Sequence, residues 1–193
     1  MEPRLPSSLA APLGRFLVLL DRWNRTHALT ALPPGERREE LLQDAAALLP
    51  FLAHLPAGAR VVDLGTGMGC PAVVLALARP DLEVIGVDAS LKKLAFVKQA
   101  AMELPIPNLK TCHGRLEDLP PLEADWGTAK AVGPLAVLMP WWARHGRTGS
   151  PFFALKGLDW EEEPLPAGWL ATPHAYTLPT RGQRVVVELR GKA

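Results

Sequence analysis

Cysteine is scarce in this chain, because Cys70 and Cys112 are the only two among its 193 residues. Two cysteines cannot build a disulfide framework and are too few for a zinc cluster, so we expect no metal site. Such sparse use of cysteine is typical of a protein kept in a reducing cytoplasm.

The sequence also lacks a long apolar run and an excess of charge. The longest apolar run near the N-terminus is Phe16 to Leu20, which is too short for a signal peptide or a membrane span. The formal net charge of +1 gives no general attraction to nucleic acid or membranes, so a polyanion would need a local basic patch. We therefore expect a cytoplasmic monomer with no membrane partner.

An alternation of strands and helices is what the sequence does contain after residue 60. The expected strands are 60–64, 83–87, 109–112, 128–132 and 151–155, the expected helices are 71–78, 91–104 and 135–145, and 169–178 with 183–190 reads as a hairpin. This order predicts a Rossmann-like α/β fold with a mainly parallel seven-stranded sheet and a C-terminal antiparallel hairpin. Expected helices from Leu13 to about Trp23 and from Glu36 to His54 would form an N-terminal helical cap.

Length and composition favour one domain. The chain has 193 residues, 48% of them hydrophobic, which suffices for one core and makes two full domains improbable. We therefore expect residues 1–193 to form a single domain, with 1–56 as the cap and 57–193 as the Rossmann-like core.

Glycines at alternate positions follow the first expected strand in the segment VVDLGTGMGC. Gly65, Gly67 and Gly69 stand between a strand and a helix, where glycine permits positive φ and close approach of a ligand. The loop has no Gly-Lys-Ser/Thr, and Cys70 replaces the sixth-place Gly or Ala of the dinucleotide fingerprint. The pattern predicts a nucleotide-like ligand, and the alternative is that the glycines only form a turn.

Acidic residues narrow the choice of ligand. Asp63 precedes the first glycine by two residues, and its carboxylate suits the amino group and sulfonium of S-adenosylmethionine better than a pyrophosphate. Asp88 follows the next expected strand, 23 residues beyond Gly65, where it can bond ribose hydroxyls. We therefore predict S-adenosylmethionine as the cofactor, with Asp63 orienting the loop or the donor's amino group; its alternative role is a helix cap or salt bridge. Cys70 is expected to pack rather than to act as a nucleophile.

The methyl acceptor is indicated mainly by what is missing. Enzymes that methylate cytosine C5 need a cysteine directly after a proline, and this chain has no Pro-Cys pair. Enzymes that methylate exocyclic amines usually carry an Asn/Asp-Pro-Pro-aromatic loop, which is also missing. A ring nitrogen with a free lone pair, such as guanine N7, requires neither and needs no general base. Catalysis there can rest on positioning, although a protein without catalytic activity would show the same absence.

Basic residues gather in two parts of the sequence. Lys130, Arg144, Arg147 and Lys156 occur between residues 126 and 158 without an acid, and the hairpin adds Arg181, Arg184, Arg190 and Lys192 against Glu188. Such clusters can hold phosphates, or they can form ordinary solvated faces. Trp141 and Trp142 could stack a base, but we expect them to pack in the core or against the cap.

These motifs together resemble the small-subunit ribosomal RNA methyltransferase G family, also called GidB, from about Asp21 to Arg190. The matching segments are RWNRTHALTAL, DLGTGMGCPAVVLALARPDLEV, VDASLKKLAFVKQ, GRLEDL, FFALKG and RGQRVVV. The glycine block is generic, whereas Gly-x-Pro, Arg-x-Glu (Arg115 and Glu117) and Leu-Lys-Gly are specific. The resemblance implies methylation of N7 of a guanine in 16S ribosomal RNA.

The resemblance also assigns site residues. It implies a cofactor site formed by Asp63, Gly65, Thr66, Gly67, Gly69, Asp88, Ala89, Leu116, Glu117 and Lys130. Lys130, Lys156 and Arg184 are the candidates for holding RNA, and Lys130 is the candidate for positioning the acceptor. Arg115 and Glu117 would form the pocket wall near the adenine, or else a local ion pair.

The chain departs from the family pattern on the side that faces the substrate. In the family's His-x-x-Asp-Ser segment, Asp44 remains but Leu41 and Ala45 stand in the histidine and serine places. Lys130 replaces an arginine and keeps the charge without the planar fork. Two alternatives stay open: a methyltransferase for a small molecule or protein, and a non-catalytic relative that binds the cofactor or RNA.

Overall fold

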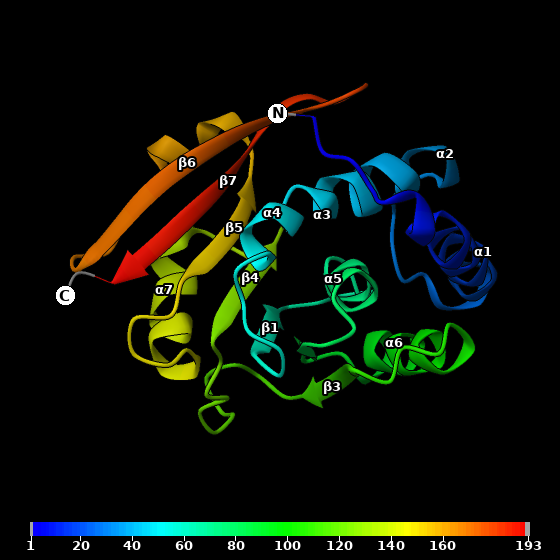
Figure 1. The fold of residues 1–193 in the computed structure, drawn as a ribbon, viewed down its shortest axis with the longest axis horizontal. Coiled ribbons are helices and arrows are strands. Elements are labelled where there is room, and N and C mark those ends of the chain that lie inside the picture. The colour runs from blue at the N-terminus through cyan, green and yellow to red at the C-terminus, as the bar shows by residue number, and fades with distance from the viewer. Residues whose placement is uncertain (1, 192–193) are drawn as a thin grey trace.

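A seven-stranded sheet forms the centre of the structure, a computed structural model that describes residues 2–191 (Figure 1). In chain order its strands are β1 (Arg60–Leu64), β2 (Glu83–Asp88), β3 (Leu109–His113), β4 (Trp126–Lys130), β5 (Phe152–Lys156), β6 (Trp169–Leu178) and β7 (Gly182–Gly191). They lie in the order β3-β2-β1-β4-β5-β7-β6. The first five strands are parallel, and β7 runs antiparallel to both β5 and β6. The expected sheet and its closing hairpin are confirmed, while Lys192 lies outside the described residues.

The helices form layers on the two faces of the sheet. The longer ones are α1 (Ala10–His27), α5 (Ala72–Ala78), α6 (Leu91–Glu103) and α7 (Leu135–His145). Figure 1 shows α1, α5 and α6 on one side of the sheet and α7 on the other. Short 3-10 turns at Ser7–Leu9 and Leu158–Glu162 complete the helical elements outside the second cap segment.

Alternate strand residues feed two apolar cores, because neighbouring side chains of a strand point to opposite faces. Val61 of β1 joins the core beneath α1, α5 and α6, whereas Val62 joins the core beneath α7. Both valines are fully buried, and burial of such a side chain contributes roughly 1.5–3 kcal/mol. The helical cap therefore shares one continuous core with the sheet.

The second cap segment is helical but broken, which differs from the single helix expected over 36–54. It consists of α2 (Pro34–Arg37), a π-helical stretch (Arg38–Gln43), α3 (Asp44–Ala46) and α4 (Leu49–Leu52). Pro50 has no N–H to donate to the preceding turn, so the regular hydrogen-bond ladder cannot pass through it. The leucines still face the core as expected, since Leu41, Leu42 and Leu48 are buried.

The first cap helix packs against α6 through aromatic rings. Phe16 and Trp23 of α1 each contact Phe96, with ring centroids 5.7 Å apart in both pairs. At the end of α1, the Asn24 amide donates to the Thr30 carbonyl at 3.0 Å and accepts from the Thr30 N–H at 2.9 Å. The Trp-Asn and Leu-Thr segments thus hold the cap in place. None of the helices within residues 2–191 is long and apolar enough to cross a bilayer.

Candidate cofactor site

The glycine loop between β1 and α5 is held in a left-handed backbone conformation. Gly65, Gly67 and Gly69 have φ of +69°, +57° and +95°, values that L side chains rarely adopt. The Thr66 N–H donates to the Val87 carbonyl at 2.8 Å, which ties the loop to the end of β2. The three glycines are therefore required by the positive φ of this loop, and they do more than mark a turn.

The three glycines serve different steric purposes. A Cβ on Gly65 would lie 2.6 Å from the Val132 side chain, and one on Gly69 would lie 3.0 Å from Val73. A Cβ on Gly67 would meet nothing closer than the Gly65 carbonyl oxygen at 4.0 Å. Gly65 and Gly69 thus allow the loop to pack, whereas Gly67 borders open space that a ligand can occupy.

Asp88 at the end of β2 holds the glycine loop directly. Its Oδ2 accepts the Gly67 N–H at 2.9 Å, and its Oδ1 accepts the Ser90 N–H at 2.8 Å. A carboxylate offers about four lone-pair positions, so each oxygen can still accept another hydrogen bond. The half-buried side chain therefore keeps the acceptor capacity that a bond to ribose hydroxyls requires, and that bond stays a prediction, while its bracing of the loop was not foreseen.

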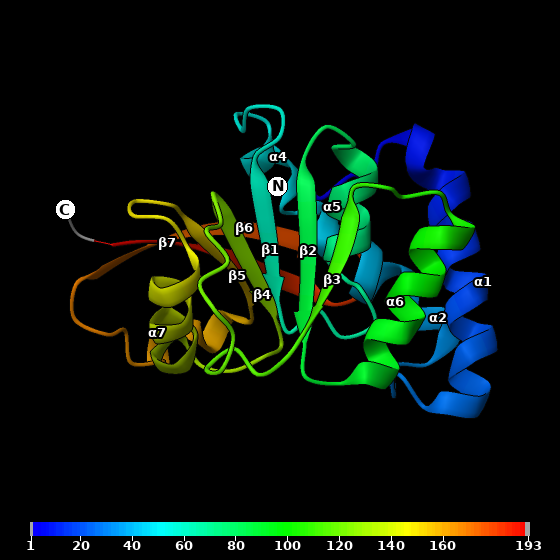
Figure 2. The same cartoon turned by 90° about the horizontal axis from the view of Figure 1, so that it is seen from below.

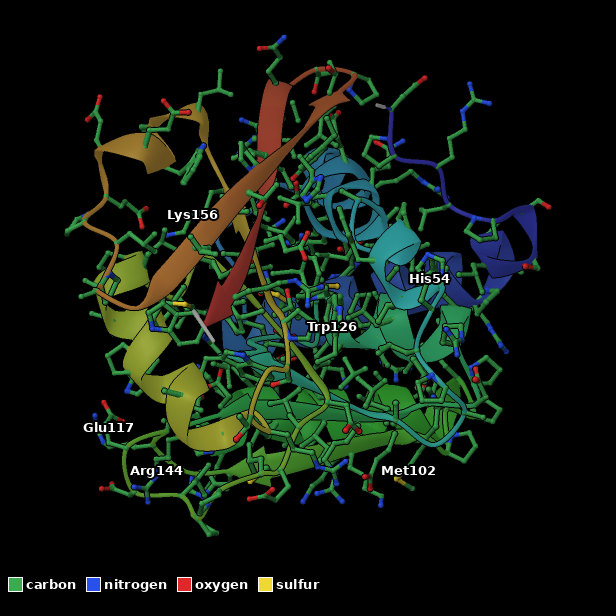
Figure 3. All side chains as sticks on the ribbon, turned by 60° about the vertical axis from the view of Figure 1, so that its left-hand side comes forward. His54, Met102, Glu117, Trp126, Arg144 and Lys156 are labelled. Atoms are coloured by element: carbon green, nitrogen blue, oxygen red, sulfur yellow. The ribbon has the colours of Figure 1, made fainter. Side chains whose placement is uncertain are left out.

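A cleft of about 230 Å³ opens beside this loop. It is lined by Gly65, Val87, Asp88, Ala89, Gly114, Arg115, Leu116, Glu117, Val132 and Trp141. Leu116 is buried in its wall, while Arg115 and Glu117 are exposed, and Figure 3 shows Glu117 at the periphery of the molecule. Neither forms an ion pair with another described residue, so their alternative role as a local ion pair finds no support.

The tryptophan pair is divided between the core and the cleft. Trp142 is buried as expected and contacts Phe152 with ring centroids 5.2 Å apart. Trp141 instead lines the cleft wall, which sequence reasoning missed. The missed signal is their adjacency on a helix, because neighbouring residues there face about 100° apart.

Asp63 lies in the interior beneath the loop rather than at the cleft surface. It is fully buried, and its Oδ2 accepts the Ala72 N–H of α5 at 3.2 Å. Burial raises the pKa of Asp63 to about 7, against the opposing effects of the Thr66 hydroxyl and the Ala72 N–H. The geometry supports a role in fixing the loop and the helix behind it.

The raised pKa of Asp63 gives a testable pH dependence. Because its folded pKa of about 7 exceeds the ordinary 3.8, protonation stabilises the fold, and that stabilisation is lost as the pH rises from about 4 through 7. Asp63→Asn should therefore become more stable than the wild type at pH 8, by up to about 4 kcal/mol, since each pKa unit is worth about 1.4 kcal/mol. Urea unfolding at pH 5 and 8 measures this, with the exposed Asp118→Asn as control. Parallel pH profiles for wild type and Asp63→Asn would contradict it.

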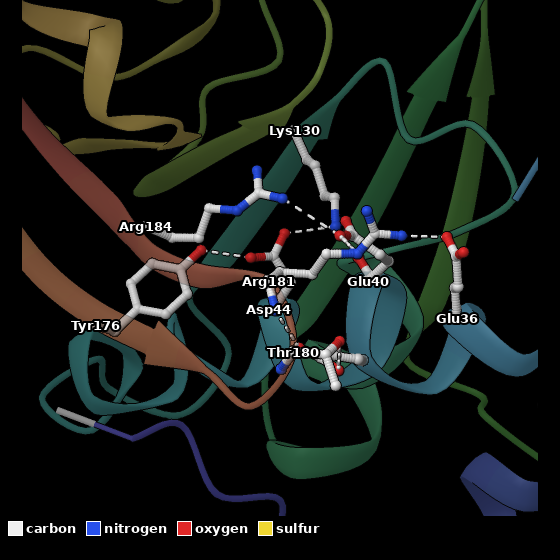
Figure 4. Close-up of polar contacts among 9 residues, drawn as sticks. Glu36, Glu40, Asp44, Lys130, Tyr176, Thr180, Arg181 and Arg184 are labelled. Carbon is white, nitrogen blue, oxygen red and sulfur yellow. Dashed lines mark hydrogen bonds and ion pairs between the residues drawn. The ribbon is translucent and has the colours of Figure 1, made fainter.

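A polar network around Lys130, the last residue of β4, joins the cap to the sheet (Figure 4). The Lys130 ammonium donates to the Asp44 carboxylate and to the Glu40 carbonyl, and the Tyr176 hydroxyl donates to Asp44. Arg184 pairs with the Glu40 carboxylate at 3.2 Å. The Lys130 and Asp44 side chains are only 16% and 5% exposed, so this is a largely desolvated pair.

Lys156, the third predicted RNA contact, is also bonded internally. Its ammonium donates to the Gly133 carbonyl at 2.8 Å and to the Glu163 carboxylate at 2.7 Å. A cavity of about 250 Å³ lies between these groups, lined by Glu40, Asp44, Lys130, Ala131, Leu155, Lys156, Gly157, Tyr176 and Arg184. The structure thus brings Lys130, Lys156 and Arg184 together, each with a protein carboxylate.

The three residues that depart from the family pattern, Leu41, Ala45 and Lys130, lie in two different environments. Leu41 and Ala45 are 3% and 0% exposed and belong to the apolar core. Asp44, between them, lines the polar cavity. The two replaced side chains therefore pack inside the protein, and only Lys130 among the substituted residues reaches the cavity.

Comparison with known proteins decides the family. A family model described as GidB, rRNA small subunit methyltransferase G, matches residues 10–169. The chain belongs to this family.

Relatives named ribosomal RNA small subunit methyltransferase G agree with the assignment to GidB. The protein from Xanthomonas euvesicatoria pv. vesicatoria (strain 85-10) is 37% identical over 96% of this chain and 89% of its own length. The one from Bordetella avium (strain 197N) is 39% identical over 81% of this chain and 73% of its own length. The resemblance inferred from the motifs is thereby confirmed.

Solved structures support the fold of this GidB member. A S-adenosylmethionine-dependent methyltransferase from Aquifex aeolicus has a TM-score of 0.60 at 16% identity, covering 88% of this chain and 97% of that one. TrmN from Thermus thermophilus has a TM-score of 0.57 at 23% identity, covering 86% and 55%. The predicted methyltransferase fold is confirmed.

S-adenosylmethionine is the cofactor of this family and fold, as predicted. The residues present suit it, because Gly67 borders open space and Asp88 retains free acceptor capacity beside the cleft. Thr66 is buried and its backbone N–H and carbonyl are both bonded within the loop and β2, so it shapes the loop, while Lys130 belongs to the polar network and not to the lining of the cleft. Which cofactor atom each residue contacts stays a prediction.

Proposed function

We propose that the chain transfers a methyl group from S-adenosylmethionine to N7 of a guanine in 16S ribosomal RNA. The observation that carries the proposal is membership of the rRNA small subunit methyltransferase G family over residues 10–169, combined with a cleft at the carboxyl ends of β1 and β2. The substrate implies a site of action where ribosomes assemble, and we retain the proposal of a cytoplasmic monomer.

The chemistry asks little of the protein beyond positioning. When bound, S-adenosylmethionine supplies the methyl group from its sulfonium, and the N7 lone pair forms the new bond as the carbon–sulfur bond breaks. Neutral guanine carries no proton on N7, so none has to be removed and no base is required. The role of the chain is to hold both partners in line at near contact distance, about 3–3.5 Å.

The residues around the cleft fit a mechanism without a covalent enzyme intermediate. Burial raises the pKa of the Cys70 thiol to about 12, so Cys70 stays protonated and does not act as a nucleophile. The lining residues include neither histidine nor cysteine within the described part of the chain. Gly67 and Asp88 supply the rigid seat, and Trp141 supplies an apolar wall.

Transfer of a labelled methyl group tests the acceptor. We expect label from S-adenosylmethionine to enter 16S ribosomal RNA, either as purified RNA or within small subunits, and to appear as 7-methylguanosine after nuclease digestion. A 16S transcript made with 7-deazaguanosine lacks the N7 lone pair and should accept no label. It should still bind, because its phosphates and its base-pairing edges are unchanged.

Each other outcome has a definite meaning. Equal labelling of the 7-deaza transcript would show that the methyl group is transferred to an atom other than guanine N7. A chain that binds the cofactor in calorimetry but labels neither RNA nor subunits would contradict the ribosomal substrate. Absence of cofactor binding would instead favour a non-catalytic relative.

A further inference from the structure

The basic residues that were expected to hold RNA are all engaged within the protein. Lys130 pairs with Asp44, Lys156 with Glu163 and Arg184 with Glu40. A phosphate that draws one of these cations away from its carboxylate leaves that largely buried acid without its partner, which is strongly unfavourable. The phosphate contacts must be sought among cations that have no such partner.

Besides Arg115 in the cleft wall, three exposed cations toward this end of the molecule form no ion pair with a described residue. Arg25 in the last turn of α1, Arg38 in the second cap segment and Lys92 in the first turn of α6 are all exposed. Their side chains form neither an ion pair nor a hydrogen bond with any residue between 2 and 191. We call Arg25, Arg38 and Lys92 the basic edge.

The basic edge lies toward the same end of the sheet as the cofactor cleft. Figure 2 shows α1 running beside α6, with the end of α1 and the start of α6 at the side toward which β1 and β2 point. Lys92 lies three residues after Ala89, which lines the cleft. Arg25 and Pro34 line one hollow of about 260 Å³, and Arg38 follows Pro34 by four residues, on the same helix face.

The acids beside the basic edge are bonded within the protein. No acid occurs between residues 22 and 35 or between residues 89 and 102. Asp21 pairs with Arg37, and Glu36 pairs with Arg181. Of the two acids that follow Arg38, Glu39 accepts from Thr180 and Glu40 pairs with Arg181. Arg25 and Lys92 therefore offer phosphates positive charge that no ion pair with a described residue neutralises.

We infer that Arg25, Arg38 and Lys92 contact RNA phosphates and hold the acceptor strand beside the cofactor cleft. Lys130, Lys156 and Arg184 instead brace the cap and hairpin against the sheet. The inference rests on the proposed RNA substrate. Such phosphate contacts give affinity and register without reading sequence.

The salt dependence of RNA binding tests the basic edge. Each lost phosphate contact should lower the slope of log affinity against log salt by about 0.7 to 0.9. The probe is purified 16S ribosomal RNA, titrated at about 50 to 200 mM KCl. For the double variant Arg25→Gln/Lys92→Gln, which removes two contacts, we expect the magnitude of the slope to fall by about 1.4 to 1.8. Its affinity for S-adenosylmethionine should equal that of the wild type.

A matched control lies on the same two helices. Arg15 is an exposed arginine ten residues before Arg25, about 15 Å along α1, and Lys98 is an exposed lysine six residues after Lys92, about 9 Å along α6. The double variant Arg15→Gln/Lys98→Gln removes the same charge away from the cleft. It should keep the wild-type slope.

The outcomes separate this inference from the proposed function. An unchanged slope in Arg25→Gln/Lys92→Gln, or an equal fall in the control, overturns the basic edge even when the wild type methylates 16S RNA. A wild type that neither binds nor labels the RNA overturns both. A fall confined to Arg25→Gln/Lys92→Gln supports the inference, whichever RNA atom is methylated.

Discussion

Replacing Gly67 with valine should abolish measurable binding of S-adenosylmethionine while the chain remains folded. Gly67 has φ of +57°, and its missing side chain leaves open space above the loop. Valine would fill that space and would strain a backbone conformation that costs a non-glycine residue about 1–3 kcal/mol. We expect affinity to fall at least about 100-fold, which corresponds to about 2.7 kcal/mol. Isothermal calorimetry measures the affinity, and circular dichroism checks the fold.

The control for backbone strain is Gly58→Val. Gly58 has φ of +79°, also with no atom within 4 Å of its absent Cβ, but it precedes the opposite end of β1. This variant should show a similar loss of thermal stability and bind the cofactor with nearly wild-type affinity. Retained binding in Gly67→Val would show that the cofactor does not lie over the glycine loop.

Replacing Lys130 with methionine should destabilise the protein by about 3–5 kcal/mol, the range found when one partner of a buried ion pair is removed. The Asp44 carboxylate, only 5% exposed, would lose its charged partner and keep the Tyr176 hydroxyl. The cap would also lose the bond from Lys130 to the Glu40 carbonyl. Urea unfolding at pH 7 measures the change in the free energy of unfolding.

Removing both charges should restore much of that loss. In Asp44→Asn/Lys130→Met neither position carries a charge, so no buried charge is left without its partner there, and we expect the double variant to be more stable than Lys130→Met alone. Lys98→Met changes an exposed lysine and should alter stability by less than about 0.5 kcal/mol. A cost below about 1 kcal/mol for Lys130→Met would mean that the pair does not hold the cap in place.

The parts of the fold that could be predicted from the sequence are those with a local signal. The strands after residue 60 appear as short β-branched runs, and β1 and α7 have the bounds expected. The edges moved by a few residues elsewhere, as in β4, which ends at Lys130 rather than Val132. The prediction of one continuous second cap helix was wrong, because the π-helical stretch and Pro50 break the helix although the leucine spacing continues through it.

The candidate site divides in the same way. The glycine loop and Asp88 could be predicted because alternate glycines after one strand and an acid after the next form a pattern that spans only about 25 residues. The place of Trp141 in the cleft wall was missed because it depends on the rotation of α7 against the sheet. The packing role of Gly65 and Gly69 was also hidden, since all three glycines look alike until Val132 and Val73 are in place.

The sequence by itself determined the class of sheet, the glycine bend after β1 and the family, because each depends on residues close together in the chain. Only the tertiary structure decided which positive charges are free to meet RNA. Lys130 and Arg184 meet Glu40 across 90 and 144 residues, and no local pattern announces such partners. The sequence shows which residues are basic, but whether a basic side chain is free to bind a phosphate depends on the acids that folding brings within bonding distance of it.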